Sequence, residues 1–441
     1  MARVPEDTRL PTEVELAYEV MSCNAMRVAQ EPIGKPHPCG YFRKWGTYHS
    51  YDYTTDGPPG QGIVHETRYV GRAPLTPELL SGCRKTPLMA VGINPNVPGW
   101  WARHRRSVAP LFDDYKQYAH YFRYREVAKL QLSEADYLAY GGGPDDTPFS
   151  EIELNIPEDE HGDRPIKVEL QPQPMYEAYQ SLLDSLAAAM GWHDAQLTVG
   201  EDLSYGNMVA MPSAKWTTRA DPGDPSLPPM TTAERDGIVS ECFRERRYFL
   251  RQLFQSLPSV LLVFSQSTAN AFIAELGARF SVGAPEPEEP LEKLMGREIR
   301  LHYGETPEGR EIDARVIFAP HVTGNPRDFA QARARVVEQL VAEAQAGRLT
   351  YNTGSHHLTR PAGACVFCPM LEIGPCDYLE ELQPLSAAPR LTADSTVASL
   401  QEEKQLQQAL MADIVESAPP VEKAWAASDE VNDVSRSKSA P

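Results

Sequence analysis

Three polar loops carry the side chains best suited to chemistry in this 441-residue chain. Their sequences are GINPNVPGWW, NMVAMPSAKW and PHVTGNPRDF, and each lies at the end of an apolar run typical of a strand. They contain Asn94, Asn207 and His321. Preorganised hydrogen-bond donors of these types stabilise a negative charge that develops during a reaction. Taken singly, each residue also fits a turn-capping asparagine or a buried histidine.

The elements that would position these residues alternate between strands and helices. Stretch 258–265, PSVLLVFS, is apolar on both faces and is therefore predicted to be a central parallel strand. The other expected strands are 87–93, 203–212, 297–303 and 313–320, and the expected helices are 108–121, 175–190, 231–255, one beginning at 266 and one beginning at Pro326. This alternation indicates an α/β fold, a three-layer αβα sandwich around a mainly parallel four-stranded sheet. Ligands bind beyond the carboxyl ends of such strands, so the two asparagines and the histidine are expected to converge on one pocket.

The helix from Pro326 has the clearest boundary signals. Asn325 is expected to be its N-cap, proline occupies its first position, Asp328 lies in its first turn and Gly347 marks its end.

Four regions are predicted along the chain. Residues 1–85 form an irregular N-terminal extension packed on the core, and 86–350 form the α/β domain. Residues 351–384 form a cysteine-rich, metal-binding segment, and 385–441 form a largely disordered acidic tail with a possible helix at 396–416. Stretches 141–170 and 281–296 are Pro-, Gly- and acid-rich insertions in the domain.

Charge and hydropathy narrow the class of protein. The net charge of −19 argues against a protein that coats nucleic acid without specificity. Arginine clusters at 103–106, 123–125 and 244–251 nevertheless allow a local basic face, or simply solvated helix faces. No apolar run approaches the ~18 residues of a membrane helix, and the seven cysteines are irregularly spaced. We therefore expect a cytoplasmic monomer that has reduced thiols and does not bind a membrane.

Four motifs resemble those of the uracil-DNA glycosylase superfamily. GINPN (92–96) resembles its first motif, especially the form in the mismatch-specific and thymine-DNA branches. GNMVAMPSAKW is similar to the segment whose asparagine reads the flipped pyrimidine, and SVLLVFSQSTANAF to the apolar strand and following helix. APHVTGNP resembles the final His-Pro-Ser loop, although Val and Thr replace Pro and Ser. The resemblance covers residues 87–345 in the correct order and implies that 86–350 is a uracil-DNA-glycosylase-like domain.

The resemblance implies an enzyme that flips a base out of DNA and hydrolyses its N-glycosidic bond. Asn94 would position the water that attacks C1′ of the sugar, and Asn207 would hydrogen-bond the base edge. His321 would donate to the carbonyl oxygen at position 2 as the departing base gains negative charge. Extrusion from the stack is needed to reach this bond. Asparagine in place of the aspartate of other branches implies a weaker water activator and a slower site.

The first loop also bears on which base is removed. Asn96 stands where strict uracil enzymes have a tyrosine that closes the pocket against C5 substituents, so a bulky C5 group becomes possible. Trp100 and Trp101 would form a platform for a sugar or a base, or else pack under the loop. These features resemble a bacterial anti-phage branch that excises α-glucosylated hydroxymethylcytosine. A simpler uracil-type lesion is the alternative substrate.

Contacts with DNA are expected from two places. Val322–Arg327 would enter the duplex, with Arg327 as a wedge or phosphate contact, or as an ordinary helix-start arginine. Arg105 and Arg106 are expected to bind DNA from the first arginine cluster.

The cysteines predict a structural metal centre. Cys365, Cys368 and Cys376 form a C-x2-C-x7-C run, which is typical of thiolates that share one metal. Cys39 is the preferred fourth ligand, with Cys23 and Cys83 in reserve, and Cys242 is expected to be a core residue. A [4Fe–4S] cluster is preferred because several branches of the superfamily contain one, although their cysteines lie mainly near the N-terminus. Zinc with His356 or His357, or three unliganded thiols, are the alternatives.

Two other functions fit parts of the sequence. A non-catalytic sensor of modified DNA is compatible with the missing aspartate of the first motif. A metal-dependent nuclease or nucleotide-processing enzyme is suggested by the cysteine run, but the sequence lacks the clustered carboxylates that magnesium-dependent phosphodiester chemistry uses.

Overall fold

The structure of the chain is a computed structural model. It describes residues 16–17, 19–20, 23, 38–39, 46–48, 51–52, 64–65, 73–75, 77–95, 130–132, 166–168, 174–213, 216, 229–305 and 311–359. The predicted helices at 108–121 and 396–416 and the predicted tail lie outside these residues. Within them, no helix combines the length and the apolar character needed to cross a membrane.

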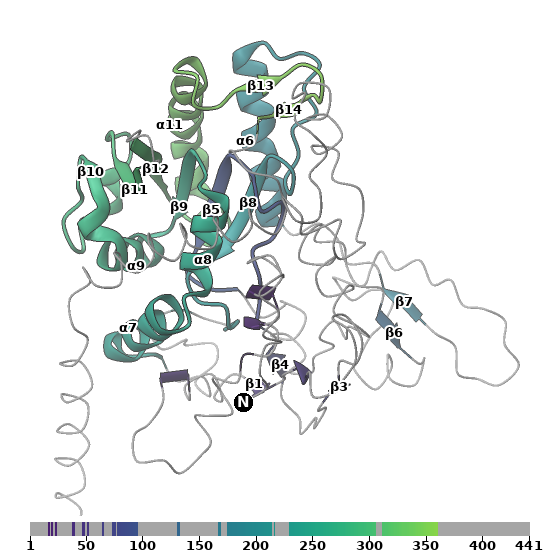
Figure 1. Ribbon diagram of the computed structural model, residues 1–441, viewed down its shortest axis with the longest axis vertical. Coiled ribbons are helices and arrows are strands. Elements are labelled where there is room, and N and C mark those ends of the chain that lie inside the picture. Colours follow the sequence, from purple (N-terminus) through teal and green to yellow (C-terminus); the bar gives the residue numbers. More distant parts are fainter. Residues whose placement is uncertain are drawn as a thin grey trace, which may run out of the picture.

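A mainly parallel sheet with helices organises the described residues as a mixed α/β fold (Figure 1). The strand order is β10-β11-β12-β9-β5-β8, so the sheet has six strands rather than the predicted four. Strands β12, β9, β5 and β8 are parallel to one another, whereas β11 and β10 extend the sheet in antiparallel fashion. The strand bounds are β5 Leu88–Gly92, β8 Leu203–Asn207, β9 Val260–Phe264, β10 Phe280–Val282, β11 Arg300–Glu305 and β12 Glu311–Ala319.

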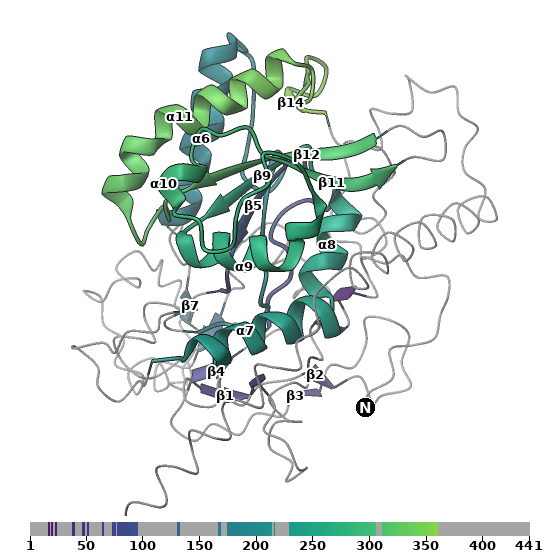
Figure 2. The same ribbon diagram turned by 90° about the vertical axis from the view of Figure 1, so that its left-hand side faces the viewer.

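Helices cover both faces of this sheet, as Figures 1 and 2 show. Alternate residues of a strand point to opposite faces, so Leu88 and Ala90 of β5 enter one core while Met89 and Val91 enter the other. Helices α6 (Pro174–Met190) and α11 (Pro326–Gln345) contribute to the first core, and α7 (Thr232–Ser240), α8 (Tyr248–Ser256) and α9 (Gln266–Leu276) contribute to the second. All five residues of β9 are buried, which confirms its prediction as a central strand.

Two helices follow their sequence patterns closely. The buried residues of α6 recur with helical spacing, and they are Tyr179, Leu182, Leu183 and Leu186. Helix α11 begins at Pro326 as predicted. Asn325 occupies its N-cap position, but its side chain makes no capping hydrogen bond.

The expected single helix at 231–255 is two helices joined by a π-helical turn, η3 (Glu241–Glu245). Arg247, which precedes α8, has φ of 58° and therefore breaks the helix. Helix α7 begins with a capping box, in which Thr231 Oγ1 accepts from Glu234 N and Glu234 Oε2 accepts from Thr231 N.

Smaller elements complete the described part of the chain. Four two-stranded sheets form there: β1 pairs with β4, β2 with β3, β6 with β7, and β13 with β14. Their bounds are β1 Gly46–Tyr48, β2 Tyr51–Asp52, β3 Val64–His65, β4 Ala73–Leu75, β6 Leu130–Leu132, β7 Ile166–Val168, β13 Tyr351–Asn352 and β14 His357–Leu358. Two short helical segments, η4 (Gly277–Arg279) and α10 (Leu291–Leu294), lie on either side of β10.

The N-terminal residues that the structure describes are part of the core. Leu16, Ala17 and Val20 are buried in the cluster that includes α8. Glu19 forms an ion pair with Arg251, and its carbonyl oxygen accepts a hydrogen bond from Tyr248 Oη at 3.3 Å.

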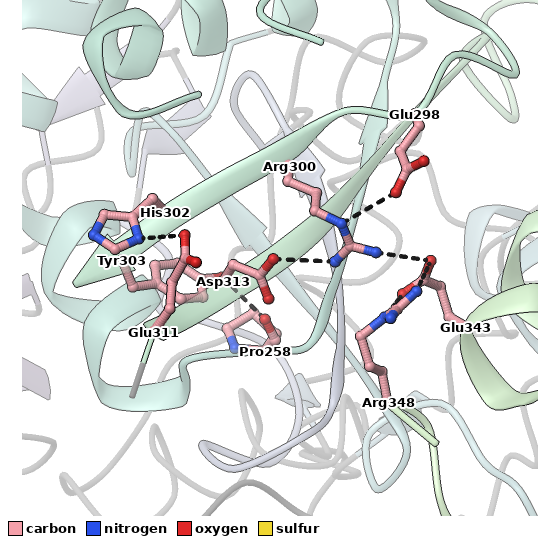
Figure 3. Close-up of polar contacts among 9 residues, drawn as sticks. All are labelled: Pro258, Glu298, Arg300, His302, Tyr303, Glu311, Asp313, Glu343 and Arg348. Carbon is pink, nitrogen blue, oxygen red and sulfur yellow. Dashed lines mark hydrogen bonds and ion pairs between the residues drawn. The ribbon is translucent and has the colours of Figure 1, made fainter. Parts of the chain in front are cut away.

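An ion-pair network fastens the end of α11 to the sheet (Figure 3). Arg300 donates to Glu298 at 3.2 Å and to Asp313 at 3.1 Å, and it lies 3.6 Å from Glu343. Glu343 is only 4 % exposed and also accepts from Arg348 Nη2 at 2.9 Å. The network lies near the amino end of β12, away from the edge where the candidate site residues lie, so its role is structural.

Candidate active site

The carboxyl ends of four parallel strands bring the three motif residues to one edge of the sheet. Asn207 is the last residue of β8 and is paired with Gly92 of β5. Asn94 follows Gly92 by two residues. His321 follows β12 by two residues, and β9 separates β12 from β5. With strands spaced ~4.8 Å apart, β5 and β12 are about 10 Å apart. Asn94 and Asn207 therefore follow adjacent strands, with His321 farther along the same edge.

Asn94 is held by the loop that follows β8. Its Nδ2 donates to Ser213 Oγ at 2.7 Å and to the Met211 carbonyl oxygen at 3.3 Å. The backbones of the two loops are also joined, because Ser213 N donates to Pro95 O at 3.0 Å. Among the described residues Oδ1 of Asn94 has no hydrogen-bond partner. The amide therefore presents an acceptor, which is the group needed to orient a water molecule.

Asn207 is fixed by a tyrosine of its own strand. Tyr205 Oη donates to Asn207 Oδ1 at 2.7 Å, and Asn207 is 7 % exposed. A glycine is required beside this pair, because a Cβ at Gly92 would lie 2.2 Å from Tyr205 Oη and 2.8 Å from Asn207 Oδ1. The glycine of the GINPN motif therefore makes room for the hydroxyl that holds Asn207.

His321 is a neutral imidazole with a defined tautomer. Its Nδ1 accepts from Gly324 N at 2.8 Å and from Thr323 N at 3.2 Å, so the ring proton lies on Nε2. Burial lowers the pKa of His321 from its ordinary value, which favours the same neutral form. The ring therefore offers Nε2–H as a donor. Gly324 allows the close turn, since a Cβ there would lie 3.2 Å from Nδ1.

Ser265 is a further residue of this edge that the sequence did not single out. It follows the central strand β9 and has φ of 86° and ψ of 153°, a region that side chains rarely adopt. Its Oγ accepts from Thr268 N at 3.2 Å and caps α9, and its backbone N donates to Ala319 O at 2.9 Å. A serine three residues before a threonine, directly after an apolar run, is the signal that could have found this cap.

Five other predicted site residues have no described position. Asn96, Trp100, Trp101, Arg105 and Arg106 lie outside the described residues.

The segment expected to enter the duplex is only partly available for that role. Arg327 is exposed at the start of α11 and makes no ion pair with another described residue. Val322 is buried in the core, 5 % exposed, so its side chain is not presented at the surface, and insertion of the rest of the segment stays a prediction.

Of the four preferred thiol ligands, only Cys39 lies in the described part of the chain. Cys39, Cys23 and Cys242 are all buried in the same core. Burial, and then the neighbouring thiols of Cys242 and Cys23, raise the pKa of Cys39. Burial also raises the pKa of Cys242 to about 12. Cys242 is a core residue, as predicted, and Cys83, the second reserve ligand, is buried too.

The histidines of the zinc alternative have carboxylate partners. His356 Nδ1 lies 3.2 Å from Asp194 Oδ2, and His357 Nδ1 lies 2.8 Å from Asp202 Oδ2. Across the described ranges, no group of three or more His, Cys, Asp and Glu side chains is arranged to hold a metal ion. The residues described here thus do not form a metal site by themselves.

At the sheet edge, then, one amide presents an acceptor, one buried amide is fixed by a tyrosine, and one neutral imidazole presents a donor. Comparison with known proteins adds no assignment: neither a protein-family model nor a curated protein matches the chain.

Proposed function

We propose that this chain is a DNA glycosylase with a uracil-DNA-glycosylase-like fold, which flips a modified or damaged pyrimidine and hydrolyses its N-glycosidic bond. The observation that carries the proposal is the state of His321. An imidazole whose Nδ1 accepts hydrogen bonds from two backbone N–H groups is a preorganised Nε2–H donor. It lies at the same sheet edge as Asn94 and Asn207, where ligands of α/β proteins bind.

Each group has a defined part in the proposed reaction. Asn94 Oδ1 accepts a hydrogen bond from a water molecule and directs its oxygen to C1′ of the sugar. The new C1′–O bond forms as the C1′–N1 bond breaks, and the bonding electrons leave with the base. His321 Nε2–H stabilises the charge that develops on the O2 carbonyl, and the water loses its proton to solvent. Stabilisation of a developing oxyanion by one such donor contributes about 3 kcal/mol in other enzymes.

The substrate that we favour is a hypermodified, glucosylated hydroxymethylcytosine in phage DNA, with a uracil-type lesion as the alternative. Support for an open pocket comes from Asn96, Trp100 and Trp101 in the sequence. A non-catalytic sensor of modified DNA is the second candidate function, because Asn94 is a weaker water activator than a carboxylate.

Base release from defined oligonucleotides tests the proposal. The full chain is incubated with DNA that contains uracil, hydroxymethylcytosine or glucosylated hydroxymethylcytosine, and alkali then cleaves any abasic site. We expect release of at least one base by the wild type and none by Asn94→Ala. Asn352→Ala is the matched control, because this amide caps a turn at Gly354 away from the sheet edge.

The outcomes separate the two candidate functions. Binding of modified DNA without abasic sites would support the sensor. Full activity of Asn94→Ala on the true substrate would contradict the proposed mechanism.

A structural [4Fe–4S] cluster held by Cys39, Cys365, Cys368 and Cys376 remains a proposal based on sequence spacing. It has no part in the reaction above. Iron and sulfide contents of the purified chain test it, with Cys39→Ser expected to lower both and Cys242→Ser, at a core residue, as the control. Zinc in place of iron would favour the alternative.

A further inference from the structure

Tyr205 and Asn207 form a side-chain pair whose orientation is determined by chemistry. They lie two residues apart on β8 and therefore project to the same face of the sheet. Tyr205 Oη lies 2.7 Å from Asn207 Oδ1. A phenol oxygen shares a lone pair with its ring and is a better donor than acceptor, so the pair is most stable with Oδ1 toward the hydroxyl. The amide Nδ2 then points away from Tyr205, and it has no hydrogen-bond partner among the described residues.

The surroundings prevent the tyrosine from moving aside. Tyr205 is 6 % exposed, and its ring packs against those of Tyr179 and Tyr176, with centroids 6.0 Å and 6.4 Å away. On the other side the hydroxyl lies over Gly92, where even a Cβ would be 2.2 Å away. A rigid donor therefore keeps the amide of Asn207 in one of its two orientations.

The two classes of pyrimidine present opposite patterns to such an amide. Uracil and its 5-substituted derivatives have a donor at N3 and an acceptor at position 4. Cytosine and its derivatives have an acceptor at N3 and a donor at position 4. An amide that rotates by 180° matches either pattern, whereas an amide fixed in one orientation matches one and meets the other donor to donor.

We propose that Tyr205 is a positioning residue that makes the site selective between keto and amino pyrimidines by fixing the amide of Asn207. This inference rests on the proposed function and deepens it. It assigns the choice between the uracil and cytosine classes to Tyr205, whereas Asn207 only contacts the base.

A substrate pair that differs only at C4 and N3 gives the sharpest test. Oligonucleotides with 5-hydroxymethyluracil or 5-hydroxymethylcytosine at one position are compared by kcat/KM for base release. The same bases on non-hydrolysable 2′-fluorinated sugars are compared by binding affinity. The variant is Tyr205→Phe, and Tyr303→Phe is the control, because it removes a buried hydroxyl that donates to Pro258 O at 3.0 Å near the amino end of β9.

We expect the wild type and Tyr303→Phe to prefer one base by on the order of tenfold to a hundredfold, the effect of leaving a buried polar group unpaired. Tyr205→Phe should bring this ratio close to one while still acting on the preferred base. A loss of stability alone would lower both activities and leave the ratio unchanged.

The two assays distinguish the inference from the proposed function. If no base is released from this pair, from uracil or from glucosylated hydroxymethylcytosine, but the binding preference is present and disappears in Tyr205→Phe, the glycosylase proposal fails and the inference stands. If base is released and the ratio in Tyr205→Phe equals that of the wild type, the inference is overturned and the glycosylase stands. A wild type that shows no preference in either assay also overturns the inference.

Discussion

Replacing Gly92 with alanine tests the close packing beneath the candidate active site. The added Cβ would lie 2.2 Å from Tyr205 Oη and 2.9 Å from Tyr205 Cζ, while ordinary van der Waals contacts begin at 3.4 Å. The tyrosine would have to retreat by more than an ångström. Its ring is held by Tyr176 and Tyr179, so this movement must disturb the core on that face of the sheet.

The expected cost has two parts. Overpacking of a well-packed core lowers stability by ~1–3 kcal/mol. Breaking the hydrogen bond from Tyr205 to Asn207 costs about 1 kcal/mol more. We therefore expect Gly92→Ala to lower the free energy of unfolding by roughly 2–4 kcal/mol.

Equilibrium unfolding in urea measures this change as a lower midpoint with an unchanged slope. Gly277→Ala is the matched control, because nothing lies within 4 Å of its Cβ and its φ is ordinary. The double variant Gly92→Ala, Tyr205→Phe should recover part of the loss, since the atom at 2.2 Å is gone. Stability of Gly92→Ala within about 0.5 kcal/mol of the wild type, or a double variant no more stable than Gly92→Ala alone, would refute this account of the packing.

Three more predictions concern pH, positioning and the ion-pair network. Burial lowers the pKa of His321 in the folded state below its ordinary value of 6.5, so the unfolded chain takes up this proton first. Stability should therefore fall as the pH decreases through 6.5 toward the folded pKa, and His321→Gln should lose this part of the pH dependence in urea unfolding. Ser213→Ala removes the acceptor 2.7 Å from Asn94 Nδ2 and should lower kcat on the order of tenfold with little change in KM. Steady-state kinetics of base release measure this change. Ser213→Thr, which keeps the hydroxyl, is the control. Glu343→Gln removes the buried carboxylate of the ion-pair network and should lower the free energy of unfolding by ~3 kcal/mol. Glu338→Gln, at an exposed position on the same helix, should leave it unchanged. Equal midpoints of urea unfolding for the two variants would contradict the structural role of the network.

Much of the fold could be predicted because single segments determine their own structure. The run VLLVF has no polar face, so it could only be a buried strand, and the apolar spacing of α6 and α11 could only bury one side of a helix. The break before α8 could not be predicted in this way. Residues 241–248 are compatible with a continuous helix, and nothing in their types indicates the positive φ that Arg247 adopts.

In the candidate site too, contacts between distant segments could not be predicted from the sequence. Asn94, Asn207 and His321 each follow an apolar strand, and that position is visible in the sequence. Ser213 is not, because its contact with Asn94 joins residues 119 positions apart. Tyr205 could have been found, since it lies two positions before Asn207 on the same strand and therefore on the same face.

The contacts of the N-terminal residues with α8 have a consequence for synthesis on the ribosome. Glu19 is made well before its partner Arg251, which lies 232 positions later in the chain. The core cluster that buries Leu16, Ala17 and Val20 is therefore incomplete until the segment containing α8 has emerged. At ~5–20 residues per second this interval lasts on the order of ten seconds or more. A chaperone that binds short apolar segments would have this time to act on the nascent chain.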